Sequence, residues 1–155
     1  MCNIRLPIVV RKRFSSSVRI GPMSRSNNKL EVEGLFRALA DRTRLRLLNL
    51  IGDDEVCVCF LVELLGESQS KISRHLAYLR RVGVVSARRE GKWIHYRITE
   101  PPNRHAARIL REVRTSLAED VTMQRERARL VKTFCLPELP VPLQGAPRPT
   151  RYLPA

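Results

Sequence analysis

Two cysteines lie two positions apart at the start of an apolar run in the stretch DDEVCVCFLVELLGESQS, residues 53–70. Thiolates are soft donors that bind soft or borderline ions such as Zn, Cd, Pb and thiophilic metalloids. Packing is the alternative explanation for Cys57 and Cys59, because free cysteine is also a common buried hydrophobe. Side chains two positions apart point about 200° apart around a regular helix, so the thiols can converge only where the first turn frays. We therefore predict that these thiols, whose ionisation a helix N-terminus favours, bind an ion at a cost in helical structure.

A second group of residues suited to binding lies on the helix predicted for residues 69–82. Ile72, Leu76 and Leu79 form its inward stripe, which leaves polar side chains on the outer face. Glutamine can pair with adenine and arginine with guanine through two hydrogen bonds, whereas serine contacts bases or phosphates. Basic residues of the hairpin that follows would lie along a flanking minor groove or the DNA backbone. The candidate DNA-binding residues are Gln69, Ser70, Ser73, Arg74, Arg80, Arg81, Arg88, Arg89 and Lys92.

The charge of the whole chain suits a polyanionic partner. Its 155 residues hold 29 Lys and Arg against 15 Asp and Glu, which gives a formal net charge of +14. Such a balance is typical of proteins that bind nucleic acid or an acidic membrane surface. The four cysteines are not spaced like a secreted disulfide framework, and the sequence shows neither a convincing secretory signal nor a membrane-spanning run. We predict a cytoplasmic protein with free thiols and no membrane partner.

The elements that must position these residues follow one another in an informative order. Apolar residues recur with helical spacing over residues 30–40, 42–51, 56–66, 69–82 and 105–134. Asp41 and Ser68 stand where N-caps belong, and Gly66 and Gly83 stand where helices end. The strings VVSARR and WIHYRI alternate in polarity around EGK, which predicts a β-hairpin. The predicted fold is mainly α with a β-hairpin wing, a winged helix-turn-helix.

The first and last of these helices are predicted to join two copies of the chain. The stripe of the first helix is Val32, Leu35, Phe36 and Leu39, and that of the last is Ala107, Leu110, Val113, Leu117 and Val121. We read residues 105–134 as a single helix. An apolar face that a small domain does not cover must be buried elsewhere, and two-fold DNA reading needs a symmetric dimer. The prediction is therefore a homodimer joined by residues 30–40 and 104–120.

Both ends of the chain differ in composition from its centre. Residues 1–28 hold six basic and no acidic residues, which predicts a disordered basic arm or a start codon placed too early, with Met23 as the alternative start. Residues 29–134 form the predicted domain for dimerisation and DNA binding. Residues 135–155 contain six prolines, a density that predicts an extended C-terminal tail without helix or central strand.

The strings LFRALADRTRLRLLNLI and EVCVCFLVELLGESQSKISRHLAYLRRVGVVSARREGKWIHYRI resemble the ArsR/SmtB family of metal-responsive repressors over residues 30–115. The resemblance implies a repressor that leaves its operator when an ion binds. Arg42 stands where the family usually has proline. The family's inducer site reads ELCVCDL where this chain has EVCVCFL, so Phe60 replaces the usual Asp. Val62 stands where several arsenic-responsive members have a third cysteine.

As(III) and Sb(III) favour three thiolates, so the departure at Val62 implies a third ligand from elsewhere. Arsenic-responsive relatives also place a cysteine near their C-termini, which favours Cys135 at the end of the last predicted helix. Cys2 is the rival, because cadmium- and lead-responsive relatives recruit N-terminal cysteines, and a two-cysteine site is the third possibility. The family's other site uses paired Asp and His on the last helix, and EPPNRHAARILREVR does not offer that pattern.

The function predicted is a homodimeric transcriptional repressor that binds operator double-stranded DNA. As(III) or Sb(III) at Cys57, Cys59 and Cys135 is the predicted inducer. The alternatives are a Cd-, Pb- or Zn-responsive repressor, and a DNA-binding regulator that responds to thiol oxidation. An enzyme is not predicted, since the sequence has no phosphate-cradling glycine loop, nucleophile elbow or His/Glu zinc motif.

Overall fold

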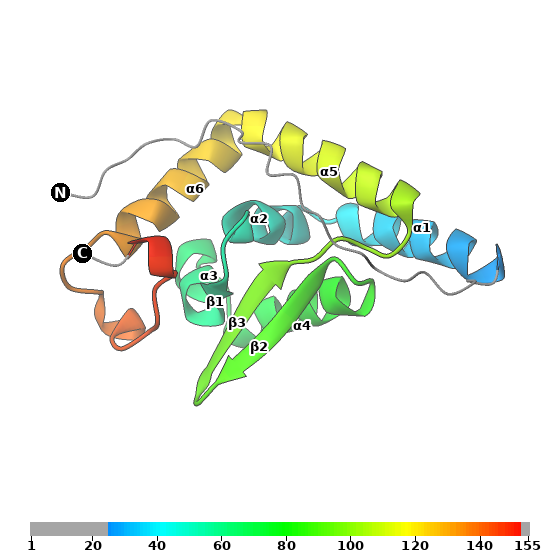
Figure 1. Cartoon of the computed structure of the whole chain (residues 1–155). Helices are drawn as coiled ribbons and strands as arrows, with labels where there is room; N and C mark the ends of the chain where they lie inside the picture. The colour runs from blue at the N-terminus through cyan, green and yellow to red at the C-terminus, as the bar shows by residue number, and fades with distance from the viewer. Residues whose placement is uncertain (1–24, 153–155) are drawn as a thin grey trace.

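The computed structural model describes residues 25–152, with side chains from residue 32 onward. The predictions for the N-terminal arm, Cys2 and Met23 lie outside the described residues. The elements run in the order expected of a winged helix-turn-helix (Figure 1). They are α1 (Arg25–Leu39), α2 (Arg42–Ile51), β1 (Val56–Cys57), α3 (Val58–Leu65), α4 (Gln69–Arg81), β2 (Val85–Glu90), β3 (Trp93–Ile98), α5 (Arg104–Glu119), α6 (Val121–Phe134) and the single-turn 3-10 helices η1 (Val141–Leu143) and η2 (Thr150–Tyr152).

The helices of the DNA-binding motif begin and end where local chemistry predicts. The Asp41 side chain accepts a hydrogen bond from the Arg44 backbone N–H at the start of α2. Ser68 does the same for Lys71 at the start of α4. Gly66 ends α3 with a φ of 63°, a left-handed conformation that glycine adopts without a Cβ penalty. These caps agree with the predicted starts of α2 and α4 and the predicted end of α3, whereas α3 begins at Val58 instead of the predicted residue 56.

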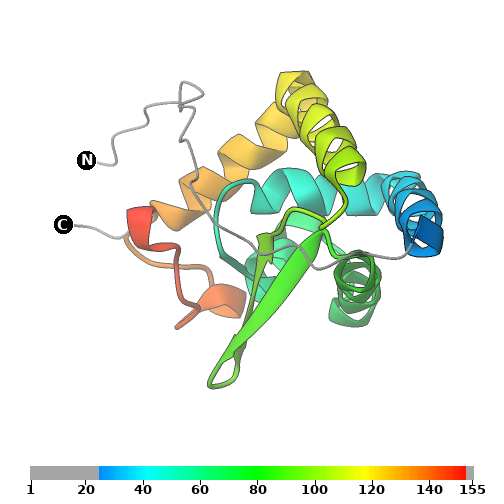
Figure 2. The ribbon, with the colours of Figure 1, turned by 45° about the vertical axis from the view of Figure 1, so that its right-hand side comes forward.

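The three strands form one antiparallel sheet in the order β1-β3-β2. The β2–β3 hairpin projects from the helical body in both views (Figures 1 and 2). β1 was not predicted as a strand. It pairs with β3, so that Val56 faces Tyr96 and Cys57 faces His95. The segment that contains Cys57 is therefore hydrogen-bonded directly to strand β3 of the wing.

The long C-terminal helix predicted for residues 105–134 is broken in two, and that prediction was wrong. Asp120 has an extended backbone (φ −71°, ψ 124°), and its side chain accepts a hydrogen bond from the Met123 N–H. Aspartate competes for backbone groups in this way and favours a helix start over a helix interior. Figure 1 shows α5 and α6 meeting at an angle above α2. Because of this break, α6 packs back on α2 and α3, while Val121 is exposed.

The Pro-rich segment that follows α6 is folded onto the domain. It has no α-helix or strand through residue 152, in keeping with its prolines. Leu143 and Ala146 are nevertheless buried, and η1 packs against α3. The Tyr152 ring lies 5.0 Å from the ring of Phe134, which meets Phe60 of α3 edge-on at 4.9 Å. Prolines prevent α-helix and sheet formation, but the apolar side chains between them can still be buried. The tail that was expected to be extended therefore covers α3 and α6, and we call this Pro-rich segment the covering segment.

One buried carboxylate holds this covering segment and α6 beside β1. The Asp54 side chain is only 4% exposed. Its Oδ2 accepts hydrogen bonds from Arg127 of α6, from Arg151 and, at 3.4 Å, from the Tyr152 hydroxyl. Since Asp54 lies just before β1, it joins α6 and η2 to the strand that contains Cys57.

Replacing Asp54 by alanine should lower the free energy of unfolding by about 3 kcal/mol, the low end for breaking a buried ion pair. The low end applies because the Arg127 and Arg151 side chains are 22% and 45% exposed, so water can solvate their charges once the carboxylate is removed. Urea unfolding of the two proteins measures the difference. Asp53→Ala is the matched control, since Asp53 is 79% exposed in its pair with Arg114 and should cost under about 1 kcal/mol. Equal losses at both positions would contradict the assignment of Asp54 as the anchor.

Candidate metal centre and nucleic-acid interface

The two thiols of Cys57 and Cys59 are already in contact. Their Sγ atoms lie 2.7 Å apart. Cys57 is the N-cap of α3 with an extended backbone (φ −65°, ψ 139°), and Cys59 lies in the first turn. The expectation that an ion must draw the thiols together at the expense of helix was wrong. The helix begins at Val58, so the two cysteines are not related by helical rotation.

The contact changes the acidity of both thiols. Cys59 donates its S–H to the sulfur of Cys57, and this hydrogen bond lowers the pKa of Cys57 to about 7 against the opposing effect of burial. The pKa of Cys59 is raised, because its proton is held by Cys57 and because it is partly buried. Near neutral pH the pair therefore holds one thiolate and one thiol, which is a suitable donor set for a soft cation.

Titration of the thiols should show one group ionising at about pH 7, and Cys59→Ala should raise that pKa. The variant removes the hydrogen bond that stabilises the Cys57 thiolate but leaves the burial that opposes it. A divalent cation such as Cd²⁺ displaces thiol protons, so its apparent affinity should fall as the pH falls. Below pH 7, where Cys57 is also protonated, each further pH unit should cost about tenfold more affinity than it does above pH 7. Thiolate absorbance measures the pKa. An unchanged pKa in the Cys59→Ala protein would contradict the assignment.

The predicted third ligand is not beside the pair. Cys57 and Cys59 are the free cysteines of the described chain, whereas Cys135, the C-cap of α6, is disulfide-bonded. The expectation of free thiols thus differs from the structure at Cys135. No group of three His, Cys, Asp or Glu side chains suited to a metal ion occurs within residues 32–152. Cys2 lies outside the described residues.

The imidazole of His95 lies across the sheet from Cys57, and sequence reasoning missed it. His95 is 5% exposed and is the β3 partner of Cys57. Its Nε2 is the one buried side-chain nitrogen or oxygen in the described part of the chain without a hydrogen bond. The Oε2 of Glu90 lies 3.9 Å from it. Only the register of β1 against β3 brings His95 near the thiols, and no sequence signal predicted β1.

The predicted DNA-reading residues share one face of α4. Ile72, Leu76 and Leu79 are fully buried, as expected. Gln69, Ser70, Arg74, Arg80 and Arg81 are exposed and Ser73 is half-buried. Side chains of the types that read base edges therefore line a helix whose inner face is fixed in the core.

The basic residues of the wing are exposed but differ in their partners. Arg88 donates to Glu55 at 2.8 Å and to Glu90 at 2.7 Å. Arg89 donates to the Gly91 carbonyl at 3.0 Å, and the Lys92 ammonium lies 4.8 Å above the Trp93 ring. Arg88 must leave two carboxylates to bind a phosphate, whereas Arg89 and Lys92 have no acidic partner in the described chain.

The helix-turn-helix of α3 and α4, followed by a projecting basic hairpin, defines a winged helix-turn-helix domain. The profile of the family described as "Bacterial regulatory protein, arsR family" matches residues 41–87. The chain is 48% identical over 79 residues to the arsenical resistance operon repressor of Escherichia coli (strain K12), which is 50% of this chain and 68% of that protein. It therefore belongs to the ArsR family of transcriptional repressors.

Other relatives agree with this assignment. The chain is 45% identical over 83 residues to the arsenic resistance transcriptional regulator ArsR1 of Pseudomonas putida, covering 53% of this chain and 65% of that protein. It is 36% identical over 66 residues to the cadmium resistance regulatory protein CadC of Listeria innocua, covering 42% of this chain and 56% of that protein. These relatives are regulators rather than enzymes, in agreement with the sequence prediction.

The fold also matches a solved structure. The homodimeric winged helix-turn-helix DNA-binding domain Mb0332 from Mycobacterium bovis superposes with a TM-score of 0.50 at 30% identity, covering 66% of this chain and 94% of that one. The predicted fold class is thereby confirmed. No helix of the described chain is long and apolar enough to cross a membrane.

Proposed function

We propose that the protein is a homodimeric repressor that leaves its operator when As(III) or Sb(III) binds to Cys57 and Cys59. The observation that supports this most is the contact between the two sulfurs at the junction of β1 and α3. A pair in which the buried Cys57 ionises readily and the half-buried Cys59 lies beside it suits a thiophilic ion. Two of the relatives reported above are named for arsenic resistance. We place the protein in the cytoplasm, where a bacterial operator lies.

The geometry of the pair suggests how binding changes the DNA interface. Two thiolates with bonds of about 2.3 Å to one ion lie about 3.3 Å apart at the near-right angles of pyramidal As(III), and about 3.8 Å apart on a tetrahedral ion. The free pair is closer, at 2.7 Å. Accommodating an ion therefore separates Cys57 from Cys59, which is the opposite of the movement expected from the sequence.

That separation acts on both DNA-binding elements. Cys57 belongs to β1, which pairs with strand β3 of the wing. Glu55, two residues earlier, holds Arg88 of the wing. Cys59 belongs to α3, the first helix of the turn motif, which packs against α4. A shift between β1 and α3 thus changes the position of the wing relative to the reading helix.

The third ligand is proposed to be Cys135, with Cys2 and a two-thiol site as the alternatives. Cys135 follows Phe134, whose ring contacts Phe60 next to Cys59. Its disulfide must be reduced before the thiolate can bind. In fully reduced protein, Cys135→Ser should weaken the arsenite response and Cys2→Ser should not. The reverse result would assign Cys2, and two unchanged responses would assign the two-thiol site.

Titration of the dimer on operator DNA with arsenite, cadmium and peroxide tests the proposed function. Release by arsenite at the lowest concentration supports the metalloid repressor. Release by cadmium first supports the alternative that the relative CadC suggests. Release only by peroxide, reversed by a thiol reductant, supports oxidation sensing through the touching sulfurs. A protein that stays bound in all three titrations would overturn the proposal.

Arg74→Ala should cost about 1–3 kcal/mol of operator affinity and relax base choice, if Arg74 contacts guanine through two hydrogen bonds. Arg88→Ala should weaken binding to all sequences alike and lower the salt dependence by at most about one charge, because Glu55 and Glu90 already hold Arg88. Binding to operator and scrambled DNA over a salt series measures both effects. Equal, sequence-independent losses at both positions would show that the reading face is misplaced.

A further inference from the structure

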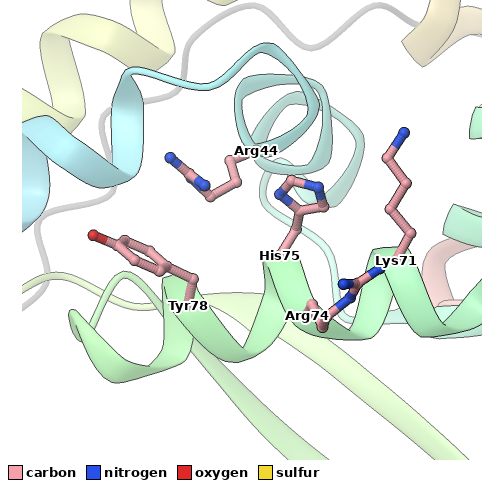
Figure 3. A pocket seen from close by; sticks show the side chains of 5 residues that line it. All are labelled: Arg44, Lys71, Arg74, His75 and Tyr78. Atoms are coloured by element: carbon pink, nitrogen blue, oxygen red, sulfur yellow. The ribbon is translucent and has the colours of Figure 1, made fainter.

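A basic groove lies beside the reading face of α4. Five side chains from α2 and α4 line it: Arg44, Lys71, Arg74, His75 and Tyr78 (Figure 3). The hollow holds about 330 Å³, roughly ten times the volume that a water molecule takes in the liquid. Arg74 belongs both to the groove and to the predicted reading residues. The groove therefore follows one flank of the helix that enters the DNA major groove.

Arg44 forms one wall of the groove, and its contacts hold the guanidinium in place. The Arg44 guanidinium donates to the carbonyl oxygens of Ala38 and Arg37, both at 2.6 Å, at the end of α1. It lies 4.7 Å above the ring of Tyr78, and Arg81 lies 4.6 Å from the same ring. These contacts hold the charge in place, because carbonyls and a ring face orient a guanidinium without cancelling its charge.

Lys71 and Arg74 form the other wall, and their side chains can change partners. Lys71 pairs with Glu67 at 2.7 Å, but the two side chains are 42% and 32% exposed, so the pair is weak and Lys71 can exchange partners. Arg74 is exposed and makes only a long 3.4 Å bond to the Ser70 carbonyl. Asp41 lies 3.6 Å from Arg44 and 3.5 Å from His75. Three cations thus face two carboxylates, and the groove is net positive before His75 is counted.

We propose that this groove binds one phosphate of the DNA backbone at the edge of the major groove. The inference rests on the proposed function and adds a contact outside the predicted DNA-binding set. A helix in the major groove has sugar-phosphate backbone along both flanks, and backbone contacts set its register. Lys71 reaches the phosphate, while Arg44 supplies a fixed positive field and Arg74 remains free to contact a base. The contact sets how far Gln69 and Ser73 reach toward the bases.

Salt dependence of binding is the first test. Lys71→Ala changes both protomers of the dimer, so it should reduce the slope of log affinity against log salt by about 1.8, which is about 0.9 for each half-site, and weaken operator and scrambled DNA equally. Over a fourfold rise in salt, the wild-type protein should then lose about 12-fold more affinity than the variant. Lys132→Ala is the matched control, because Lys132 is an exposed lysine near the end of α6, and its slope should not change. An unchanged slope in the Lys71→Ala protein would overturn the inference.

Neutralising single phosphates is the second test. Methylphosphonate substitution along the operator should reveal one position per half-site that weakens the wild-type protein and has no further effect on Lys71→Ala. If the affinity loss from the methylphosphonate adds to the loss from Lys71→Ala at every position, the groove assignment is overturned. If millimolar inorganic phosphate protects Lys71 from acylation as well as operator DNA does, the groove is a free-anion site and the inference fails. Operator binding by the wild-type protein is scored in the same assay, so failure of the proposed function is seen separately.

Discussion

Replacing Cys57 or Cys59 by serine is expected to abolish ion-induced release while leaving operator binding intact. Serine has nearly the same size but is a poor ligand for a soft ion. The sulfurs contact each other at the start of α3, and neither belongs to α4 or to the β2–β3 hairpin, so the free dimer should still bind. The ion need favour the non-binding state by only about 1–3 kcal/mol to act as an inducer. Operator occupancy during arsenite titration measures the loss.

One result with a double variant would show that Cys57 and Cys59 do not sense the ion. A Cys57→Ser, Cys59→Ser double variant that still leaves DNA on arsenite or cadmium would refute the sensing role. If the cysteines only fill the core, the double variant should instead unfold more easily, since Cys57 is fully buried, with its response unchanged. Urea unfolding of the same proteins separates the two explanations. Cys2→Ser, which should leave the response unchanged, serves as the control for general loss of a thiol.

Phe36→Glu is expected to make the protein monomeric and to weaken operator binding by at least about 100-fold. Phe36 belongs to the apolar stripe that was predicted to join two copies of the chain, and it is 56% exposed, while Leu35, Ala38 and Leu39 of the same helix are buried. A large exposed aromatic ring on α1, beside α5, marks a surface that a second copy can cover. Without the dimer, two half-sites are no longer bound as one unit, and avidity of about 100-fold or more is lost.

Sedimentation at micromolar concentration and operator titration measure this change together. Val141→Glu is the matched control, because Val141 is 80% exposed in η1, away from α1 and α5. It should leave both dimerisation and DNA binding unchanged. A Phe36→Glu protein that sediments as a dimer would place the interface elsewhere. A monomeric wild-type protein that binds operator tightly would refute the dimer altogether.

The sequence by itself determined the order and type of most elements of the DNA-binding motif. Asp41 and Ser68 cap their helices through their own side chains, and Gly66 ends α3 because its backbone is left-handed. These are local interactions, so a window of a few residues contains all that decides them. The stripe of Ile72, Leu76 and Leu79 likewise fixed which face of α4 is buried. The same stripe led to the prediction of the residues that read DNA, which lie on the opposite face.

The tertiary structure decided how the candidate site is assembled. β1 exists because it pairs with β3, forty residues further along the chain, and this pairing makes Cys57 extended rather than helical. The contact of the two sulfurs follows from that conformation, as does the position of His95 across from Cys57. The burial of Leu143 and the exposure of Phe36 depend in the same way on surfaces that other elements supply. Caps and helical stripes are short-range effects, whereas strand pairing and burial join residues far apart in the chain. Only the folded molecule therefore brings the two thiols together at the junction of β1 and α3, between the wing and α4.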